Sequence, residues 1–198
     1  MITIKKGNFK NLSITINHEG QIIIKSPKYL KDKEIEKFYL SKKGWIDKHT
    51  RHLETQNKIK SNYDFNHFVY LYTNIFKEIK SKEESHIIYK EIFNREIIPL
   101  VVKLANYYGF KKPINIKPMK SKRIWGSLSN KNEMKLNILI SILPKILTEY
   151  IIIHELCHSK EFNHSPQFWN LVQSIMPNYK IIKKKLGDYS FILRSNIL

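Results

Sequence analysis

The stretch Tyr150-Ile-Ile-Ile-His154-Glu155-Leu-Cys-His158 decides the fold of this 198-residue chain. Its apolar first half predicts a buried helix. Because an α-helix turns by about 100° per residue, His154 and His158 lie on one face, a turn apart, where both imidazoles can bind one metal ion. An unpaired imidazole or carboxylate would be costly on a buried helix. The stretch therefore predicts a metal site on a central helix.

Two further residues complete the predicted site. Glu155 lies too far round the helix to be a natural third ligand, but it can reach a water molecule on the metal as a general base. His164 can close on the same ion from a short connector, since Ser165 and Pro166 read as the N-cap and first residue of the next helix. A fourth position then stays open for water. The expected ligands of one Zn²⁺ per chain are His154, His158 and His164.

The same pattern also arises by chance on solvated helices that bind no metal. The apolar residues before the motif and the third histidine both favour the metal site. Cys157 points away from the two motif histidines and is expected to be a small core residue rather than a ligand. A closed structural zinc site would need a fourth protein ligand, and Cys157 is badly placed to provide it.

Composition bounds the class of protein. A hydrophobic content of 42% is ordinary for a globular chain, and a single cysteine excludes an intramolecular disulfide framework. The first ten residues lack the apolar segment of a secretory signal. No stretch has the length and purity of a membrane span. We therefore expect a soluble, cytoplasmic protein without a membrane partner, and the sequence carries no signal for an oligomeric state.

The chain is strongly basic, with 35 Lys and Arg against 17 Asp and Glu and a net charge of +18. One interpretation is compositional, because lysine is the default solvated residue in a chain so rich in Lys, Ile and Asn. The other is functional, because a positive field attracts nucleic acid, nucleotides or acidic proteins. Non-specific nucleic acid contact is therefore an open expectation. The densest clusters are residues 183–185 and the group Lys120, Lys122 and Arg123.

Periodicity predicts an α+β fold. Alternating residues favour a hairpin or small meander in residues 1–25, helical spacing favours one or two helices in 32–58, and β-rich composition favours a strand in 68–79. A long helix over 82–108 should be kinked or split at Pro99. The remaining expected elements are strands over 114–119, 123–127 and 133–138, the motif helix from Pro144, and helices over 166–176 and 178–186.

Several motifs together resemble the YgjP-like metallopeptidases, a bacterial family of predicted zinc-dependent hydrolases. The resemblance is densest over residues 123–177. It implies an N-terminal β-rich lobe with a helix over residues 1–81, and a zincin-like metallopeptidase domain over 82–198 that is akin to SprT-like and minimal gluzincin folds. It also implies zinc on the three histidines and a catalytic Glu155. The motifs are Trp125-Gly126-Ser127, Lys135-Leu136-Asn137, His154-Glu155-Leu156-Cys157-His158, Asn163-His164-Ser165-Pro166 and Phe168-Trp169.

The predicted strand over residues 123–127 is a candidate edge for an extended peptide, which main-chain hydrogen bonds can hold without demanding a sequence. The candidate substrate-binding residues are Arg123, Trp125, Gly126 and Ser127. A second interpretation makes Trp125 a core aromatic and Gly126 a bulge. Asn137 is a candidate for fixing a turn. Arg123, Tyr150 or a backbone N–H is expected to stabilise the oxyanion.

Three functions follow from these residues. The first is a zinc-dependent metallopeptidase that acts on polypeptide through a metal-activated water, with Glu155 as general base. The alternative is a metal-dependent hydrolase of a nucleotide or another phosphorylated anionic substrate, which the positive charge would suit. The third, a binding module with a structural zinc, ranks last because a fourth protein ligand is missing.

Overall fold

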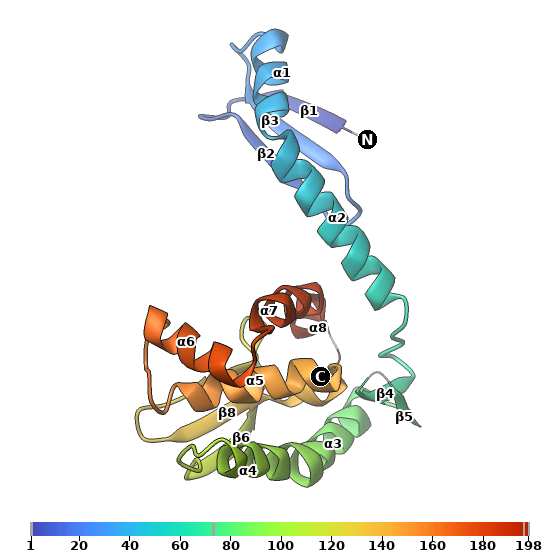
Figure 1. Cartoon of the computed structure of the whole chain (residues 1–198). Coiled ribbons are helices and arrows are strands. Elements are labelled where there is room, and N and C mark those ends of the chain that lie inside the picture. Colours follow the sequence, from blue (N-terminus) through green and yellow to red (C-terminus); the bar gives the residue numbers. More distant parts are fainter. Residues whose placement is uncertain (1, 73, 196, 198) are drawn as a thin grey trace. The chain divides into compact units, whose positions relative to one another are not determined.

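The structure is a computed structural model that describes residues 2–72, 74–195 and 197. The chain forms two compact units, Met1–Ser61 and Asn62–Leu198, and Figure 1 labels the elements of both. Each unit contains helices and strands, which confirms the expected α+β fold. Among the described residues, no helix is long and apolar enough to cross a membrane.

The first unit is a three-stranded sheet followed by two helices. The strand order is β1-β3-β2, with β1 parallel and β2 antiparallel to the central β3. The expected hairpin is β2–β3, and Asn17 Oδ1 fixes its turn by accepting from Gln21 N at 2.8 Å. The elements are β1 (Ile2–Gly7), β2 (Ser13–Ile16), β3 (Ile22–Pro27), α1 (Asp32–Ser41) and α2 (Lys43–Lys60).

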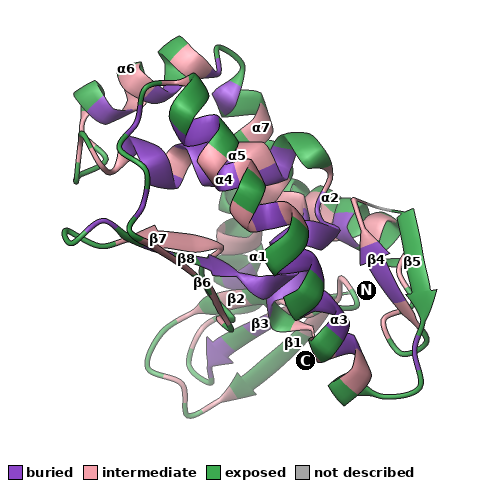
Figure 2. Cartoon of the chain, turned by 90° about the horizontal axis from the view of Figure 1, so that it is seen from below, coloured by how far each residue is buried: buried purple, intermediate pink, exposed green. Residues whose placement is uncertain are grey.

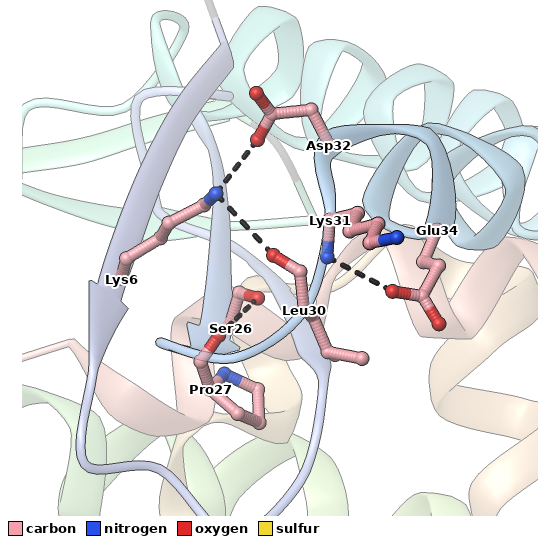
Figure 3. A network of polar contacts seen from close by, with 7 residues as sticks. All are labelled: Lys6, Ser26, Pro27, Leu30, Lys31, Asp32 and Glu34. Atoms are coloured by element: carbon pink, nitrogen blue, oxygen red, sulfur yellow. Dashed lines mark hydrogen bonds and ion pairs between the residues drawn. The ribbon is translucent and has the colours of Figure 1, made fainter.

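A polar network joins β1 to the start of α1, as Figure 3 shows. Lys6 Nζ donates to Asp32 Oδ1 at 2.7 Å and to the carbonyl of Leu30 at 3.4 Å. Lys31 N donates to Glu34 Oε2 at 2.9 Å. A side chain from the first turn of α1 thus provides a hydrogen-bond acceptor for the backbone N–H of the N-cap residue. This sheet and its helices bury few large apolar residues, chiefly Ile24, Ile35 and Ile46.

The hairpin of β4 (Phe68–Leu71) and β5 (Asn74–Glu78) confirms the expected strand character of residues 68–79. β4 packs against helix α3 and the segment before the motif helix, whereas β5 is exposed (Figure 2). Tyr70 N donates to Tyr89 Oη at 3.3 Å and Tyr72 N to the carbonyl of Ser141 at 2.9 Å. These contacts hold the hairpin in the second compact unit, Asn62–Leu198.

The long helix expected over residues 82–108 is split near Pro99. It consists of α3 (Lys82–Ile92), a π-helical segment (Phe93–Ile97) and α4 (Ile98–Tyr107). Pro99 stands in the first turn of α4, directly after the π-helical segment, and its missing N–H removes one hydrogen bond to the preceding turn, which fits the irregular helix at this point. Phe93 and Ile97 of the π-helical segment are fully buried, so the irregular turn is part of the core.

The second three-stranded sheet has the order β6-β8-β7, so β7 is an edge strand. The strand expected over residues 123–127 is shorter and starts later. Ser121 Oγ accepts from the backbone N–H groups of Arg123 and Ile124, both at 3.2 Å, and this turn keeps residues 121–124 out of the sheet. The strands are β6 (Asn115–Met119), β7 (Gly126–Leu128) and β8 (Glu133–Asn137).

The motif helix α5 (Lys145–Cys157) is the centre of the second unit. Nine of its 13 residues are buried, and it contacts β7, α4, α6 and α7. In Figure 1, α4 lies on one side of α5 and α7 on the other. A helix that is apolar nearly all round is stable only in such a position. The remaining elements are a 3₁₀ segment (Ile138–Ile142), α6 (Pro166–Ile175), α7 (Tyr179–Asp188) and α8 (Ser190–Arg194).

Candidate metal centre

Three histidines converge at the end of α5. One ligand nitrogen from each of His154, His158 and His164 lies within 4.8 Å of the others. Nε2 of His154 and Nε2 of His164 are 3.0 Å apart. Two nitrogen ligands of one tetrahedral zinc ion are about 3.4 Å apart at ordinary bond lengths. The observed separations bracket this value, so the three imidazoles fit a single metal ion.

His164 reaches the cluster through the connector between α5 and α6. Ser165 caps α6, because its Oγ accepts from Phe168 N at 3.3 Å, and Pro166 is the first residue of the helix. Both features were expected from the sequence. Phe168 is fully buried and stacks on His158 at 4.5 Å between ring centroids. Its edge meets the ring of His164 at 4.8 Å, so one aromatic side chain supports both histidines.

Outer contacts fix the orientation of the imidazoles. Nδ1 of His158 lies 3.0 Å from the carbonyl oxygen of Glu161. Because a carbonyl only accepts, Nδ1 carries the proton and Nε2 keeps its lone pair free for a metal. Nδ1 of His154 is buried and has no hydrogen-bond partner within the described ranges. Packing against Phe168 and Trp169 orients that ring instead.

The electrostatics favour neutral imidazoles. Burial, followed by the charges of His158, His164 and Lys183, lowers the pKa of His154 to about 3. The pKa of His164 is lowered by burial and then by His158 and Lys183. A neutral imidazole is the form that binds a metal. Cys157 is fully buried, and burial raises the pKa of its thiol to about 12, so it behaves as the expected core residue.

Glu155 lies against the backbone of the edge strand. Its side chain is buried, and burial raises the pKa of its carboxyl group to about 7. A Cβ atom on Gly126 would lie 2.7 Å from Cγ of Glu155 and 2.8 Å from its Oε1. These distances are too short for real contacts, so a side chain at position 126 would displace the carboxyl group. The pairing of β7 with β8 has a regular register, and Gly126 therefore serves a close approach rather than a bulge.

The histidines and Glu155 border a cavity of about 470 Å³ whose other wall is β7. The cavity is lined by Trp125, Gly126, Ser127 and Tyr150. Burial raises the pKa of the Tyr150 hydroxyl group to about 12. Trp125 is half-buried, so it is a pocket residue rather than a core aromatic. Arg123 is exposed and does not belong to the lining, because the Ser121 turn holds it before the strand.

Asn137 ties the segment before β7 to the sheet. Its backbone N donates to the carbonyl of Trp125 at 2.7 Å, and its Nδ2 donates to the carbonyl of Ser121 at 2.9 Å. Its Oδ1 accepts from Leu139 N at 3.1 Å. The side chain is 1% exposed, so water cannot replace these bonds. The structure thus gives Asn137 the turn-fixing position that the sequence suggested.

The lining residues that the sequence did not predict for the site are Leu128, Ile151, Phe162, Lys183 and Leu186. Lys183 and Leu186 come from α7, which contacts α5. Their spacing with Tyr179 is i, i+4 and i+7, which marks one helix face. This periodicity was a signal for a shared face, but it did not reveal which helix the face would meet.

The donor set suits zinc. Three imidazole nitrogens with room for a water molecule form the usual ligand set of a catalytic zinc ion, and the sole cysteine is outside it. The cavity beside the nitrogens leaves the fourth position accessible.

The comparisons with known proteins bear on the family of this chain. The family model described as YgjP-like, metallopeptidase domain, matches residues 73–189, more than half of the chain. The crystal structure of the metallopeptidase zymogen of Pyrococcus abyssi abylysin is 25% identical, with a TM-score of 0.41, and the match covers 44% of this chain and 89% of that one. No curated protein matches the chain significantly. Since the family match spans the whole motif helix and the third histidine, the chain belongs to the YgjP-like metallopeptidase family.

Proposed function

We propose that the protein is a zinc-dependent metallopeptidase that binds one Zn²⁺ through His154, His158 and His164. The observation that carries the proposal is the placement of three converging imidazoles and a buried carboxyl group beside an edge strand. An edge strand offers unpaired backbone groups to an extended peptide. The cavity between strand and histidines is where the scissile bond would lie.

Glu155 acts as the general base. When bound, zinc lowers the pKa of a coordinated water and polarises the scissile carbonyl group. The Glu155 carboxylate would take a proton from the attacking water and return it to the departing amine. A carboxyl pKa raised by burial to about 7 suits a group that must both accept and donate near neutral pH. The Tyr150 hydroxyl stays protonated, since its pKa is raised to about 12, and can donate to the substrate carbonyl oxygen.

The nucleotide hydrolase is less well supported. Such an enzyme needs two or more basic side chains that converge on the phosphates within reach of the metal. Among the described residues that line the cavity, Lys183 is the only lysine, and no arginine is present. The cavity is also bordered by a strand edge, which suits a peptide backbone better than a phosphate chain.

Metal analysis and one near-isosteric substitution test the proposal. We expect about one zinc per chain, and a marked loss of zinc from His158→Ala and His164→Ala. Glu155→Gln keeps all three histidines, so it should retain zinc while casein cleavage falls roughly 10²- to 10⁴-fold, the usual effect of losing a general base.

The same proteins should be assayed on a panel of nucleoside triphosphates. Glu155-dependent release of phosphate or pyrophosphate, without Glu155-dependent cleavage of casein, would favour the alternative hydrolase. Full zinc occupancy in His164→Ala would show that another residue closes the site.

A further inference from the structure

One cation stands at the mouth of the cavity. Lys183 to Lys185 form a run of three lysines on α7, but Lys183 alone of the three lines the cavity. It is exposed, and its Nζ lies 4.0 Å from the centroid of the Trp169 ring. In the sequence, the three lysines form one dense cluster of charge. The structure separates its first member from the other two.

An aromatic stack holds Lys183 in place. The Trp169 ring stacks on Tyr179 with centroids 5.3 Å apart and an interplanar angle of 12°. It also stacks on His164 at 5.4 Å and 21°. A cation over an indole ring gains about 0.5–1 kcal/mol at an exposed site and more when desolvated. The ammonium group is therefore biased toward a position one aromatic ring away from an expected metal ligand.

Lys183 has no acidic partner in the part of the chain that the structure describes. No carboxylate of the described residues lies within ion-pair distance of its Nζ, and Glu155 is the sole acidic residue in the cavity lining. An unpaired cation at the rim of a cleft attracts anionic groups and repels cationic ones.

We propose that Lys183 makes the site selective for peptides that carry a carboxylate next to the scissile bond. This inference rests on the proposed peptidase function. The carboxylate is either an Asp or Glu side chain or the free C-terminus of a short peptide, and both offer the same oxygens to the ammonium group. Lys183 is a specificity residue rather than a catalytic one, since it acts on a group beside the reacting bond.

Matched peptides and a charge-swap series test the inference. Peptides of one sequence should carry Glu, Gln or Lys at each position flanking the cleaved bond, and each should be made with a free and an amidated C-terminus. The proteins are wild type, Lys183→Met, Lys183→Glu and Lys184→Glu. Lys184→Glu is the control, because it makes the same change in net charge on the same helix outside the cavity lining.

We expect wild type to cleave the Glu peptide roughly tenfold better than the Gln peptide in kcat/KM, as for one partly screened charge-assisted bond. Lys183→Met should remove this preference, Lys183→Glu should shift it toward the Lys peptide, and Lys184→Glu should keep it. If the preference follows C-terminal amidation instead, the carboxylate is the chain end. Equal kcat/KM for all peptides in wild type, or an undiminished preference in Lys183→Met, would overturn the inference.

Binding separates this inference from the proposed function. Fluorescence anisotropy of labelled Glu and Gln peptides on the Glu155→Gln protein measures selectivity without turnover. Cleavage by wild type without any Lys183-dependent preference refutes the role of Lys183 and leaves the peptidase proposal standing. Lys183-dependent binding of the Glu peptide, with no Glu155-dependent cleavage of any peptide, supports the carboxylate site and refutes the peptidase.

Discussion

The two three-stranded sheets of the molecule have the same connectivity but different neighbours. In each, the first strand runs parallel to a central third strand, and the second strand pairs antiparallel to it at the edge. The edge strand β2 contacts helix α2, which buries two of its 18 residues. The edge strand β7 contacts α5, which buries nine of 13 and carries the metal motif.

The shared topology of the two sheets is therefore not sufficient to form the site. Both sheets present an open edge, yet the edge strand of one contacts the helix that carries the three-histidine motif, and the edge strand of the other contacts a mostly exposed helix. What differs is the side chains at the interface between edge strand and helix. On β7, the missing Cβ of Gly126 leaves room for the Glu155 carboxyl group, whereas every residue of β2 carries a side chain. Function thus depends on a few residues placed on a common scaffold.

Among the substitutions that test this comparison, Gly126→Ala should cause the largest loss of activity. The new methyl group would overlap Cγ and Oε1 of Glu155 and push the carboxyl group out of its present place beside the three histidines. A misplacement of about 1 Å can cost up to roughly 100-fold in rate. We expect kcat to fall about 10- to 100-fold with KM and zinc content nearly unchanged, as measured by steady-state kinetics and elemental analysis.

The control for this substitution is Gly44→Ala on α2. A Cβ on Gly44 meets no atom within 4 Å, so activity should stay at the wild-type level and stability should rise slightly through better helix propensity. Wild-type kcat in Gly126→Ala would show that Glu155 tolerates the displacement and would remove the distinction between the two edges.

Two asparagines allow a second comparison of the two sheets, in terms of stability. Asn137 and Asn17 each fix a turn beside an edge strand, but Asn137 is 1% exposed and Asn17 is half-buried. Asn137→Ala leaves the carbonyls of Ser121 and Ile124 without that donor, so the second unit should lose about 1–3 kcal/mol of unfolding free energy. Asn17→Ala should cost less than about 1 kcal/mol, because water reaches its partners.

Urea unfolding followed by hydrogen exchange, which reports each unit separately, measures both effects. Asn137→Ala should also lower kcat/KM, because it loosens the chain that leads into β7. Equal losses of protection in the two variants would contradict the proposed difference between the two sheets.

The smallest effect is expected for Asp32→Asn in the first unit. Its ion pair with Lys6 is solvent-exposed, with 40% and 89% of the two side chains accessible. Exposed pairs of this kind contribute at most about 1 kcal/mol. We expect a change within that limit in thermal unfolding and no change in peptidase activity. A large loss of activity would show that the first unit takes part in the reaction.

The metal side of the site was readable from the sequence because it is local. Two histidines a helical turn apart and a third just before a capped helix need no distant contact to converge, and the structure brings their nitrogens together. The split near Pro99 and the strand character of residues 68–79 were also local and were confirmed, although the structure divides the second segment into two strands.

The substrate side could be predicted only in part because it depends on long-range packing. Arg123 was expected on the edge strand, but hydrogen bonds from the Ser121 turn and from Asn137 hold that segment outside the sheet. The space that Gly126 leaves for Glu155, and the position of Lys183 over Trp169, each join segments far apart in the sequence. No periodicity within one segment encodes such a pairing.

The compactness of the ligand set in the sequence bears on how the metal affects folding. His154 to His164 span eleven consecutive residues, so an unfolded chain keeps these imidazoles near one another. A metal stabilises a fold only by the difference between its affinities for the folded and unfolded states. Ligands that stay close together in the unfolded chain can still bind the metal there, so the difference between the two affinities becomes smaller. We therefore expect chelation to cost this protein less stability than it costs domains whose ligands meet only on folding, and expect a nascent chain to be able to take up its metal early.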